Sequence, residues 1–295
     1  MIKFPLNFCV IGAPKCGTTS LCSWLSSTPG IHFSSPKEPN FFNVDHVDPW
    51  RPSEEKYLDW LTPASDGELI GEGSVWYLHS KAAIPRIESC TTECKFVVCL
   101  RNPLQMAVSL HQQQLYSGNE TITDFNYAWS LSSERRIGNF VPSTCFESAL
   151  IDYEGACSTG DQLIRLLSTV ERSRVHFVFF DELCRNPELV YSQVTKFLEI
   201  DGAANLDFSP VNVAKVRPFP RLRRLSKQLG VIKSSFGIDK SFGLLSWMDS
   251  LNSKHKKYDI SESDLVESLK RFSDDQVNKI ENVTLRSLAH WKSVR

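Results

Sequence analysis

The chain has 295 residues, 41% hydrophobic and 23% charged, a composition that excludes disordered, collagen-like and coiled-coil proteins. Thirty-three basic residues against 34 acidic ones leave a formal net charge of -1, so no global field attracts a polyanion or an anionic membrane. Any anion must bind through local groups. The nine scattered cysteines favour a reduced, cytoplasmic setting. No apolar run approaches the roughly 20 residues that span a bilayer, so neither a membrane span nor a signal peptide is expected.

Short apolar runs bounded by turn residues recur along the chain, and this pattern predicts buried parallel strands. The expected strands are Phe8–Ile11, Glu68–Gly71, Phe96–Leu100 and Val175–Phe180. Segments with helical spacing separate them, so the alternation predicts an α/β fold, a mostly parallel central sheet flanked by helices in three layers. Because the chain shows no internal repeat and no low-complexity linker, residues 1–295 are expected to form a single domain.

Helix boundaries can be read from the residues that start and stop helices. The expected helices are Thr18–Ser26, Leu104–Tyr116, Phe146–Leu167 and Pro187–Leu198. The second of these follows Asn102 as N-cap and Pro103 at its first position. A capping box formed by Ser273 and Gln276 predicts the start of the last helix.

A glycine-containing loop, Gly12–Ser20, follows the first strand and opens the first helix. There, backbone N–H groups and the helix N-terminus converge on one anion, which predicts a phosphate-binding loop. The Walker pattern requires Gly-Lys-Ser/Thr, but Gly17 is followed by Thr18 and the lysine lies inside the loop at Lys15. Hydrolysis of a nucleoside triphosphate is therefore not favoured, and no metal is expected because no acidic partner for Mg²⁺ is evident. The alternative is a tight strand-to-helix turn and nothing more.

Two motifs together carry a resemblance to a known family. Pro14–Leu21 resembles the 5′-phosphosulfate loop of sulfotransferases that use 3′-phosphoadenosine 5′-phosphosulfate, and Leu100–Ser109 resembles their 3′-phosphate motif. The resemblance extends to Lys37–Phe42, Gly71–Leu78 and Leu288–Trp291, and is nearest the bacterial and Golgi carbohydrate-type branch. It implies a P-loop, nucleotide-kinase-like fold and a sulfotransferase that moves a sulfuryl group from this donor to a hydroxyl or amine.

The resemblance also implies which residues bind the donor. They are Lys15, Cys16, Gly17, Thr18, Thr19 and Ser20 in the loop, Arg101 and Ser109 at the 3′-phosphate, and Lys215 and Arg217 in a stretch that closes over the donor. The last two open a basic run in the least regular region, 205–257, interpreted as a functional excursion from the domain. A solvated charged face is the alternative for the rest of that run. Nucleic-acid binding is not expected, because Phe219 is its sole aromatic residue for stacking.

Glu38 matches the catalytic glutamate of the carbohydrate branch and is the predicted general base. Phe41 and Phe42 are expected to supply apolar walls that raise its proton affinity. Lys15 is predicted to act in catalysis too, by stabilising charge on the leaving phosphate. The alternative base is His79, whose spacing from Arg101 is like that of the catalytic histidine in the cytosolic small-molecule branch.

The sequence predicts the acceptor only as a broad chemical class, whereas it predicts one specific donor. Asn40, Gly73 and Met106 stand where many relatives carry a histidine, a lysine and a basic residue. A carbohydrate or glycolipid is expected, and a phenol, alcohol or lipid is the alternative if His79 is the base. The residues also leave open a P-loop phosphotransferase and a nucleotide-sensing module without turnover. A Golgi lumen setting replaces the cytoplasm if an N-terminal anchor precedes the chain.

Overall fold

The fold is described from a computed structural model. The described residues are 3–63, 65–203, 206–209, 215–216, 254–255 and 266–292, and for 215–216 and 254–255 the backbone alone. By its internal contacts the chain divides into two compact units. The first unit comprises residues 1–106, 158–212 and 271–295, and the second comprises 107–157 and 213–270. That both belong to one domain stays a prediction.

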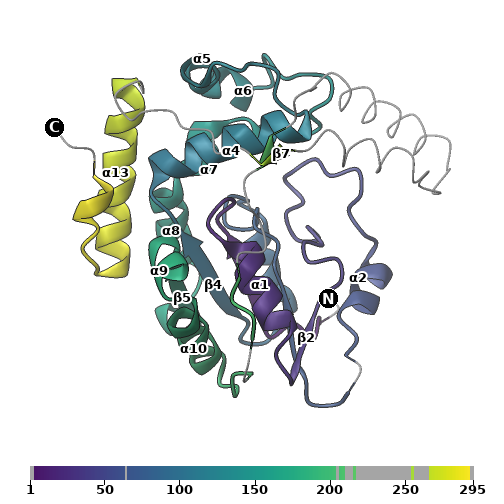
Figure 1. Cartoon of the computed structure of the whole chain (residues 1–295). Helices are drawn as coiled ribbons and strands as arrows, with labels where there is room; N and C mark the ends of the chain where they lie inside the picture. The colour runs from purple at the N-terminus through teal and green to yellow at the C-terminus, as the bar shows by residue number, and fades with distance from the viewer. Residues whose placement is uncertain are drawn as a thin grey trace. The chain divides into compact units, whose positions relative to one another are not determined.

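A parallel five-stranded sheet forms the centre of the first unit (Figure 1). Its strands lie in the order β2-β3-β1-β4-β5. The strands are β1 (Phe8–Gly12), β2 (Ile31–Phe33), β3 (Leu69–Glu72), β4 (Lys95–Leu100) and β5 (Val175–Phe179). The four strands predicted from sequence are confirmed to within one residue at each end. The edge strand β2 was not predicted, because three residues are too few to show a pattern. Every residue of β1 is buried, as its central position requires.

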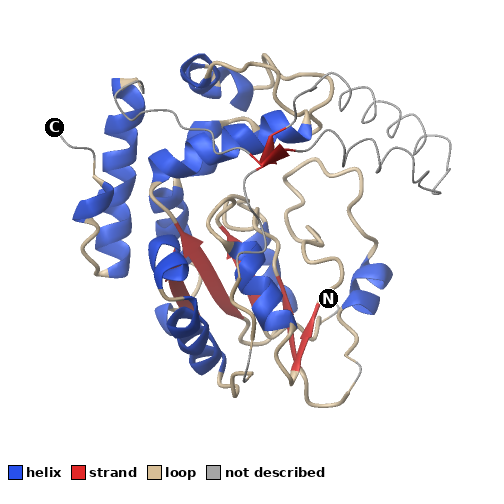
Figure 2. Cartoon of the chain, in the orientation of Figure 1, coloured by secondary structure: helices blue, strands red, loops and turns tan. Residues whose placement is uncertain are grey.

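Helices flank this sheet, which confirms the α/β prediction (Figure 2). Those of the first unit are α1 (Thr18–Ser26), α2 (Glu54–Trp60), α3 (Ala83–Cys90), α8 (Thr159–Leu167), α9 (Phe180–Arg185), α10 (Pro187–Leu198) and most of α13 (Glu267–Thr284). The carboxyl end of β1 leads into α1, and that of β4 into α4 (Pro103–Ser117). Asn102 accepts a hydrogen bond from the backbone of Leu104, as its predicted capping role requires.

The predicted single helix over Phe146–Leu167 is wrong. The segment instead forms the 3₁₀ turn η1 (Ser148–Leu150), α7 (Tyr153–Cys157) and α8. Asp152 stands at the first break, where its carboxylate accepts a hydrogen bond from the Gly155 N–H at 3.0 Å. Ser158 stands at the second, as the residue before α8, and its side chain forms no capping hydrogen bond there. At Asp152 a short polar side chain competes for backbone N–H groups, which favours a helix start over a helix interior.

The predicted start of the last helix at Ser273 is also wrong, because α13 already begins at Glu267. Ser273 is buried inside the helix. The amide oxygen of Gln276 accepts hydrogen bonds from the N–H groups of Gly160 at 2.9 Å and Asp161 at 3.3 Å. Gln276 therefore caps α8 rather than α13, the helix to which it belongs. A local sequence pattern does not distinguish a glutamine that caps its own helix from one that caps a neighbouring helix.

The second unit has its own core. Its helices are the part of α4 from residue 107 on, α5 (Phe125–Ser130), α6 (Ser132–Arg136) and α7, and its short strands β6 (Lys215–Val216) and β7 (Lys254–His255) pair antiparallel. The rings of His111, Phe125 and Tyr153 contact one another in this core. Most of the predicted excursion at 205–257 lies outside the described residues. No helix of the described part is long and apolar enough to cross a membrane.

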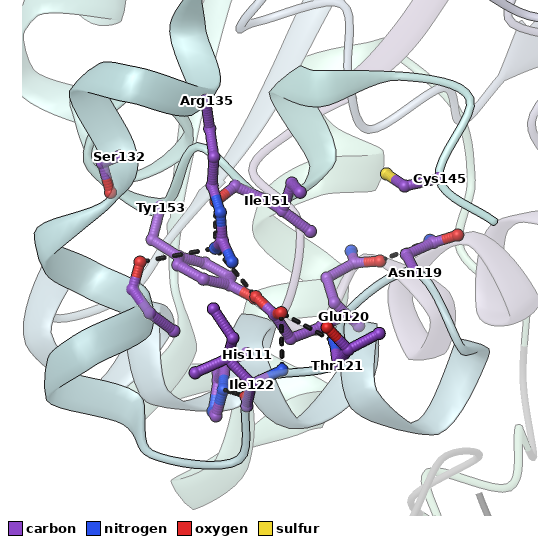
Figure 3. Close-up of polar contacts among 12 residues, drawn as sticks. His111, Asn119, Glu120, Thr121, Ile122, Ser132, Arg135, Cys145, Ile151 and Tyr153 are labelled. Carbon is purple, nitrogen blue, oxygen red and sulfur yellow. Dashed lines mark hydrogen bonds and ion pairs between the residues drawn. The ribbon is translucent and has the colours of Figure 1, made fainter. Parts of the chain in front are cut away.

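A fully buried ion pair between Glu120 and Arg135 lies in this core (Figure 3). The carboxylate of Glu120 accepts hydrogen bonds from the Tyr153 hydroxyl and from the backbone N–H groups of Thr121 and Ile122, at 2.7 to 2.9 Å. Nη1 of Arg135 lies 2.8 Å from that carboxylate. Its Nε and Nη2 find no hydrogen-bond partner among the described residues. The arginine therefore depends on Glu120 for compensation of its buried charge.

Replacing Glu120 with glutamine should lower the free energy of unfolding by about 3–5 kcal/mol, because it leaves the Arg135 charge buried without its counter-ion. Urea unfolding of the purified chain measures the change. The control is Glu154→Gln, which breaks a half-exposed pair with Arg136 and should cost no more than about 1 kcal/mol. Equal losses in the two variants would contradict the importance of the buried pair.

Candidate functional site

The turn from β1 into α1 requires its two glycines. Gly12 has φ +144°, and a Cβ atom there would lie 2.7 Å from the carbonyl oxygen of Val75. Gly17 has φ +85°, and its Cβ would lie 2.3 Å from Cδ2 of Leu183. Gly17 is also the N-cap of α1, and none of the described side chains caps this helix. The N–H groups at the start of α1 are therefore available to an anion.

Two cationic residues meet at this turn. Nη1 of Arg101, the residue after β4, donates a hydrogen bond to the carbonyl oxygen of Lys15 at 3.2 Å. The Arg101 guanidinium lies 4.4 Å from the centre of the Phe180 ring. Burial lowers the pKa of Lys15, and the charge of Arg101 lowers it further. Burial likewise lowers the pKa of Arg101. Two like charges held together in a buried turn are typical of a site that binds an anion.

The remaining loop residues take different positions. Thr18 is buried in the first turn of α1, and Thr19 and Ser20 are half-buried beside it. The Cys16 thiol points into the core, where it lies 3.9 Å from the sulfur of Met106. Burial raises the pKa of this thiol to about 12, so Cys16 contributes packing and its backbone rather than a thiolate.

The other predicted donor-binding residues lie elsewhere in the chain. Ser109 lies on α4 in the part that belongs to the second unit, so its joint action with Arg101 stays a prediction. For Lys215 the structure describes the backbone of β6 alone. Arg217 lies outside the described residues.

The predicted base, Glu38, lies in the segment that follows β2. Its carboxylate forms an ion pair with Lys37 at 2.6 Å, and about a third of its side chain is exposed. The position of this ion pair relative to α1 follows from its electrostatic effect on the buried thiol of Cys22, a residue of that helix. Burial raises the pKa of Cys22 to about 12, the Lys37 charge opposes that rise, and the Glu38 and Glu72 charges add to it. Glu38 therefore lies near α1, the helix that follows the β1–α1 turn.

The aromatic residues after Glu38 anchor the segment in the core. The Phe41 ring stacks on Tyr57, with ring centres 4.3 Å apart and planes 7° apart. The Phe42 ring contacts Tyr57 and Phe4 edge-on. The contacts that the structure gives these rings are with one another and with the core, whereas the carboxylate of Glu38 contacts Lys37. That Glu38 acts as the base stays a prediction.

His79, the alternative base, takes part in a hydrogen-bonded network. Its Nδ1 lies 2.9 Å from Nε2 of His46. Arg165 donates to the backbone carbonyl oxygens of Leu78 and His79 at 2.6 and 2.8 Å. These contacts tie His79 to α8 and to the segment around His46, so the structure gives it a clear packing role. No group of three or more His, Cys, Asp or Glu side chains in the described ranges is arranged to hold a metal ion.

Sequence reasoning missed Glu72, the last residue of β3, which is fully buried. Its carboxylate accepts hydrogen bonds from the hydroxyls of Tyr57 and Ser74, both at 3.0 Å. Burial raises its pKa to about 7, although the hydroxyl groups of Ser74, Tyr77 and Tyr57 lower it and the charge of Glu38 adds to the rise. The signal in the sequence that could have indicated a buried carboxylate was a glutamate at the end of an apolar strand.

The raised pKa of Glu72 gives stability a specific pH dependence. The folded chain keeps a proton between the ordinary pKa of 4.5 and about 7, whereas the unfolded chain loses it. Stability should therefore fall as pH rises through this window, by up to about 3 kcal/mol from this group. Urea unfolding at pH 5 and pH 8 measures it: Glu72→Gln should gain stability relative to wild type at pH 8. A stability difference between the two proteins that is the same at both pH values would contradict this assignment.

The chain is similar to several known proteins. It is 31% identical over 105 residues to a membrane-associated sulfotransferase, kil1, of Dictyostelium discoideum, covering 35% of this chain and 22% of that protein. It is 26% identical over 216 residues to bifunctional heparan sulfate N-deacetylase/N-sulfotransferase 1 of Caenorhabditis briggsae, and the match covers 68% of this chain and 24% of that protein. The matched part thus spans about a quarter of these relatives' lengths. A sulfotransferase crystal structure from Alicyclobacillus acidocaldarius superposes with a TM-score of 0.65 at 22% identity, covering 97% and 98% of the two chains.

The fold agreement with this crystal structure extends over nearly the whole chain. The family model described as "Sulfotransferase domain" matches residues 6–236, more than half of the sequence. The matched range contains the β1–α1 turn, the Glu38 segment and Arg101. The chain therefore belongs to the sulfotransferase domain family.

Proposed function

We propose that this chain transfers a sulfuryl group from 3′-phosphoadenosine 5′-phosphosulfate to a hydroxyl or amine of an acceptor. The observation that carries the proposal is the meeting of Lys15 and Arg101 at the uncapped start of α1. Family membership supplies the reaction class. The lysine inside the loop, in place of the Gly-Lys-Ser/Thr arrangement, argues against a nucleoside triphosphate as substrate.

The charges of the turn fit this donor, which carries one phosphate bonded to the sulfuryl group and a second on the ribose. Lys15 and the first N–H groups of α1 would hold the sulfated 5′-phosphate. Arg101 would hold the 3′-phosphate with Ser109, since the planar guanidinium suits bidentate contact with phosphate oxygens. An anion between Lys15 and Arg101 would also relieve the repulsion between them. When bound, the donor supplies the activated sulfuryl group.

The chain's own residues then have defined tasks. The Glu38 carboxylate takes the proton of the acceptor hydroxyl or amine as the new bond to sulfur forms and the bond from sulfur to the phosphate oxygen breaks. Lys15 stabilises the charge that develops on that phosphate oxygen. Lys37 holds the carboxylate of Glu38 through their ion pair.

A carbohydrate or glycolipid is the acceptor class we propose. The name of the C. briggsae relative includes heparan sulfate N-sulfotransferase, and the same relative extends far beyond the matched region. The assignment of Glu38 as base agrees with this acceptor class, because the alternative base His79 belongs with small-molecule acceptors. The Glu38 segment lies in the first unit beside α1.

The chain should bind 3′-phosphoadenosine 5′-phosphate far more tightly than AMP, and without Mg²⁺. Arg101→Ala should weaken the binding of the bisphosphate about 10- to 100-fold and leave the affinity for AMP unchanged, because a charged hydrogen bond of this kind contributes roughly 1.5–3 kcal/mol. Calorimetry in chelator and then in Mg²⁺ measures both affinities. Arg185→Ala, at an exposed arginine on α9, is the matched control. Equal affinity for the two nucleotides, or a requirement for metal, would favour a phosphotransferase instead.

Glu38→Gln should keep donor affinity and lose about 10²–10⁴-fold in turnover, because the amide cannot accept the proton of the acceptor. Transfer of labelled sulfate to a panel of glycans, glycolipids and phenols measures turnover, with His79→Ala as the comparison. Normal turnover by Glu38→Gln together with an inactive His79→Ala would show that the base is the histidine and that the acceptor is a small molecule.

A further inference from the structure

Glu72 is buried with no lysine or arginine paired to it in the described part of the chain. The hydroxyls of Tyr57 and Ser74 donate hydrogen bonds to it instead, and the Tyr77 hydroxyl also lowers its pKa. Burying a carboxylate without a counter-ion costs free energy, and hydrogen bonds from hydroxyls offset part of that cost. The other contacts of these three residues therefore bear on the role of Glu72.

All three hydroxyl-bearing residues hold the same short segment. The Ser74 oxygen accepts a hydrogen bond from the N–H of Asn40 at 3.0 Å. The Tyr77 oxygen accepts from the N–H groups of Phe41 and Phe42 at 3.0 and 3.2 Å. Tyr57 contacts the segment through its ring, which stacks on Phe41. Two hydrogen-bond partners of the Glu72 carboxylate thus contact the segment, Ser74 at the N–H of Asn40 and Tyr57 at the ring of Phe41.

The residue after Glu72 adds a direct link. The N–H of Gly73 donates to the carbonyl oxygen of Lys37 at 3.0 Å. A Cβ atom on Gly73 would lie 2.6 Å from the sulfur of Cys22 and 3.3 Å from Cε of Lys37. The end of β3 therefore contacts the segment on both sides of Glu38.

The direction of these hydrogen bonds follows from the chemistry of the groups. A hydroxyl has one hydrogen to donate and lone pairs to accept with. A carboxylate accepts only, so it takes the hydroxyl hydrogens of Ser74 and Tyr57 and leaves the lone pairs of Ser74 to face the N–H of Asn40. A glutamine side chain would present an N–H₂ donor to one of these hydroxyls and disturb that order.

We propose that Glu72 is a positioning residue for the candidate base, and that its buried carboxylate orders Ser74, which holds the N–H of Asn40, and Tyr57, which stacks on Phe41, and thereby places Glu38. This inference rests on the proposed function, in which Glu38 accepts the proton of the acceptor. A displacement of about 1 Å at a reacting group can cost about 10²-fold in rate.

The test compares Glu72→Gln with Glu68→Gln, a matched change just before the start of β3, at pH 8. We expect Glu72→Gln to lower kcat about 10- to 100-fold, to leave donor affinity within about twofold, and to leave unfolding in urea no easier than in wild type. Amide hydrogen exchange of residues 40–42 should become at least about tenfold faster in Glu72→Gln and stay unchanged in Glu68→Gln. Unchanged exchange, or an unchanged kcat, would overturn the proposal.

A double variant separates positioning from an independent effect. If Glu72 acts through Glu38, Glu72→Gln should cause no further loss of turnover in the Glu38→Gln background. Losses that multiply would overturn the proposal while leaving Glu38 as the base. If the unmodified chain transferred no sulfuryl group, the proposed function would fail together with the catalytic part of this inference, and the exchange data would still decide whether Glu72 holds the segment.

Discussion

The β1–α1 turn has no room for side chains at two positions, and the rest of the site depends on this constraint. At Gly12 a side chain would strike the carbonyl oxygen of Val75, and at Gly17 it would strike Leu183 of α9. Because the backbone passes so close to its neighbours, the start of α1 is left without a side-chain cap. The same close passage brings the carbonyl oxygen of Lys15 to the guanidinium of Arg101. A tight turn thus becomes a concentrated positive site in a chain whose net charge is nearly zero.

The parallel sheet explains why these groups meet. In a parallel sheet the carboxyl ends of neighbouring strands lie at one edge, where open α/β folds bind their ligands. β1, β3 and β4 are adjacent in the sheet, and at their carboxyl ends lie the β1–α1 turn, Glu72 and Arg101 respectively. The Glu38 segment follows β2, at the edge of the sheet next to β3. The groups proposed to bind the donor and to accept the proton therefore follow strands that are neighbours in the sheet.

The chain buries two carboxylates in two different ways. Glu120 is compensated by the full charge of Arg135, an arrangement that belongs to the core of the second unit. Glu72 is compensated by hydroxyls, which can accept hydrogen bonds from elsewhere while they donate to it. An arginine would satisfy the charge but could accept nothing. The hydroxyl arrangement leaves the pKa of Glu72 near 7 and connects it to the segment that carries Glu38.

The sequence by itself determined four of the five strands of the parallel sheet, the glycine-containing loop between β1 and α1, Arg101 after β4 and the family, because each depends on contiguous residues and local spacing. It placed the last helix start at Ser273 and merged α7 with α8, because Gln276 caps a helix more than 100 residues away in the sequence. Only the tertiary structure decided that the loop cations repel one another, that Lys37 pairs with Glu38, and that Glu72 is connected to residues 40–42. These features depend on burial and on side chains from separate strands, and no spacing along the chain specifies which of them will meet.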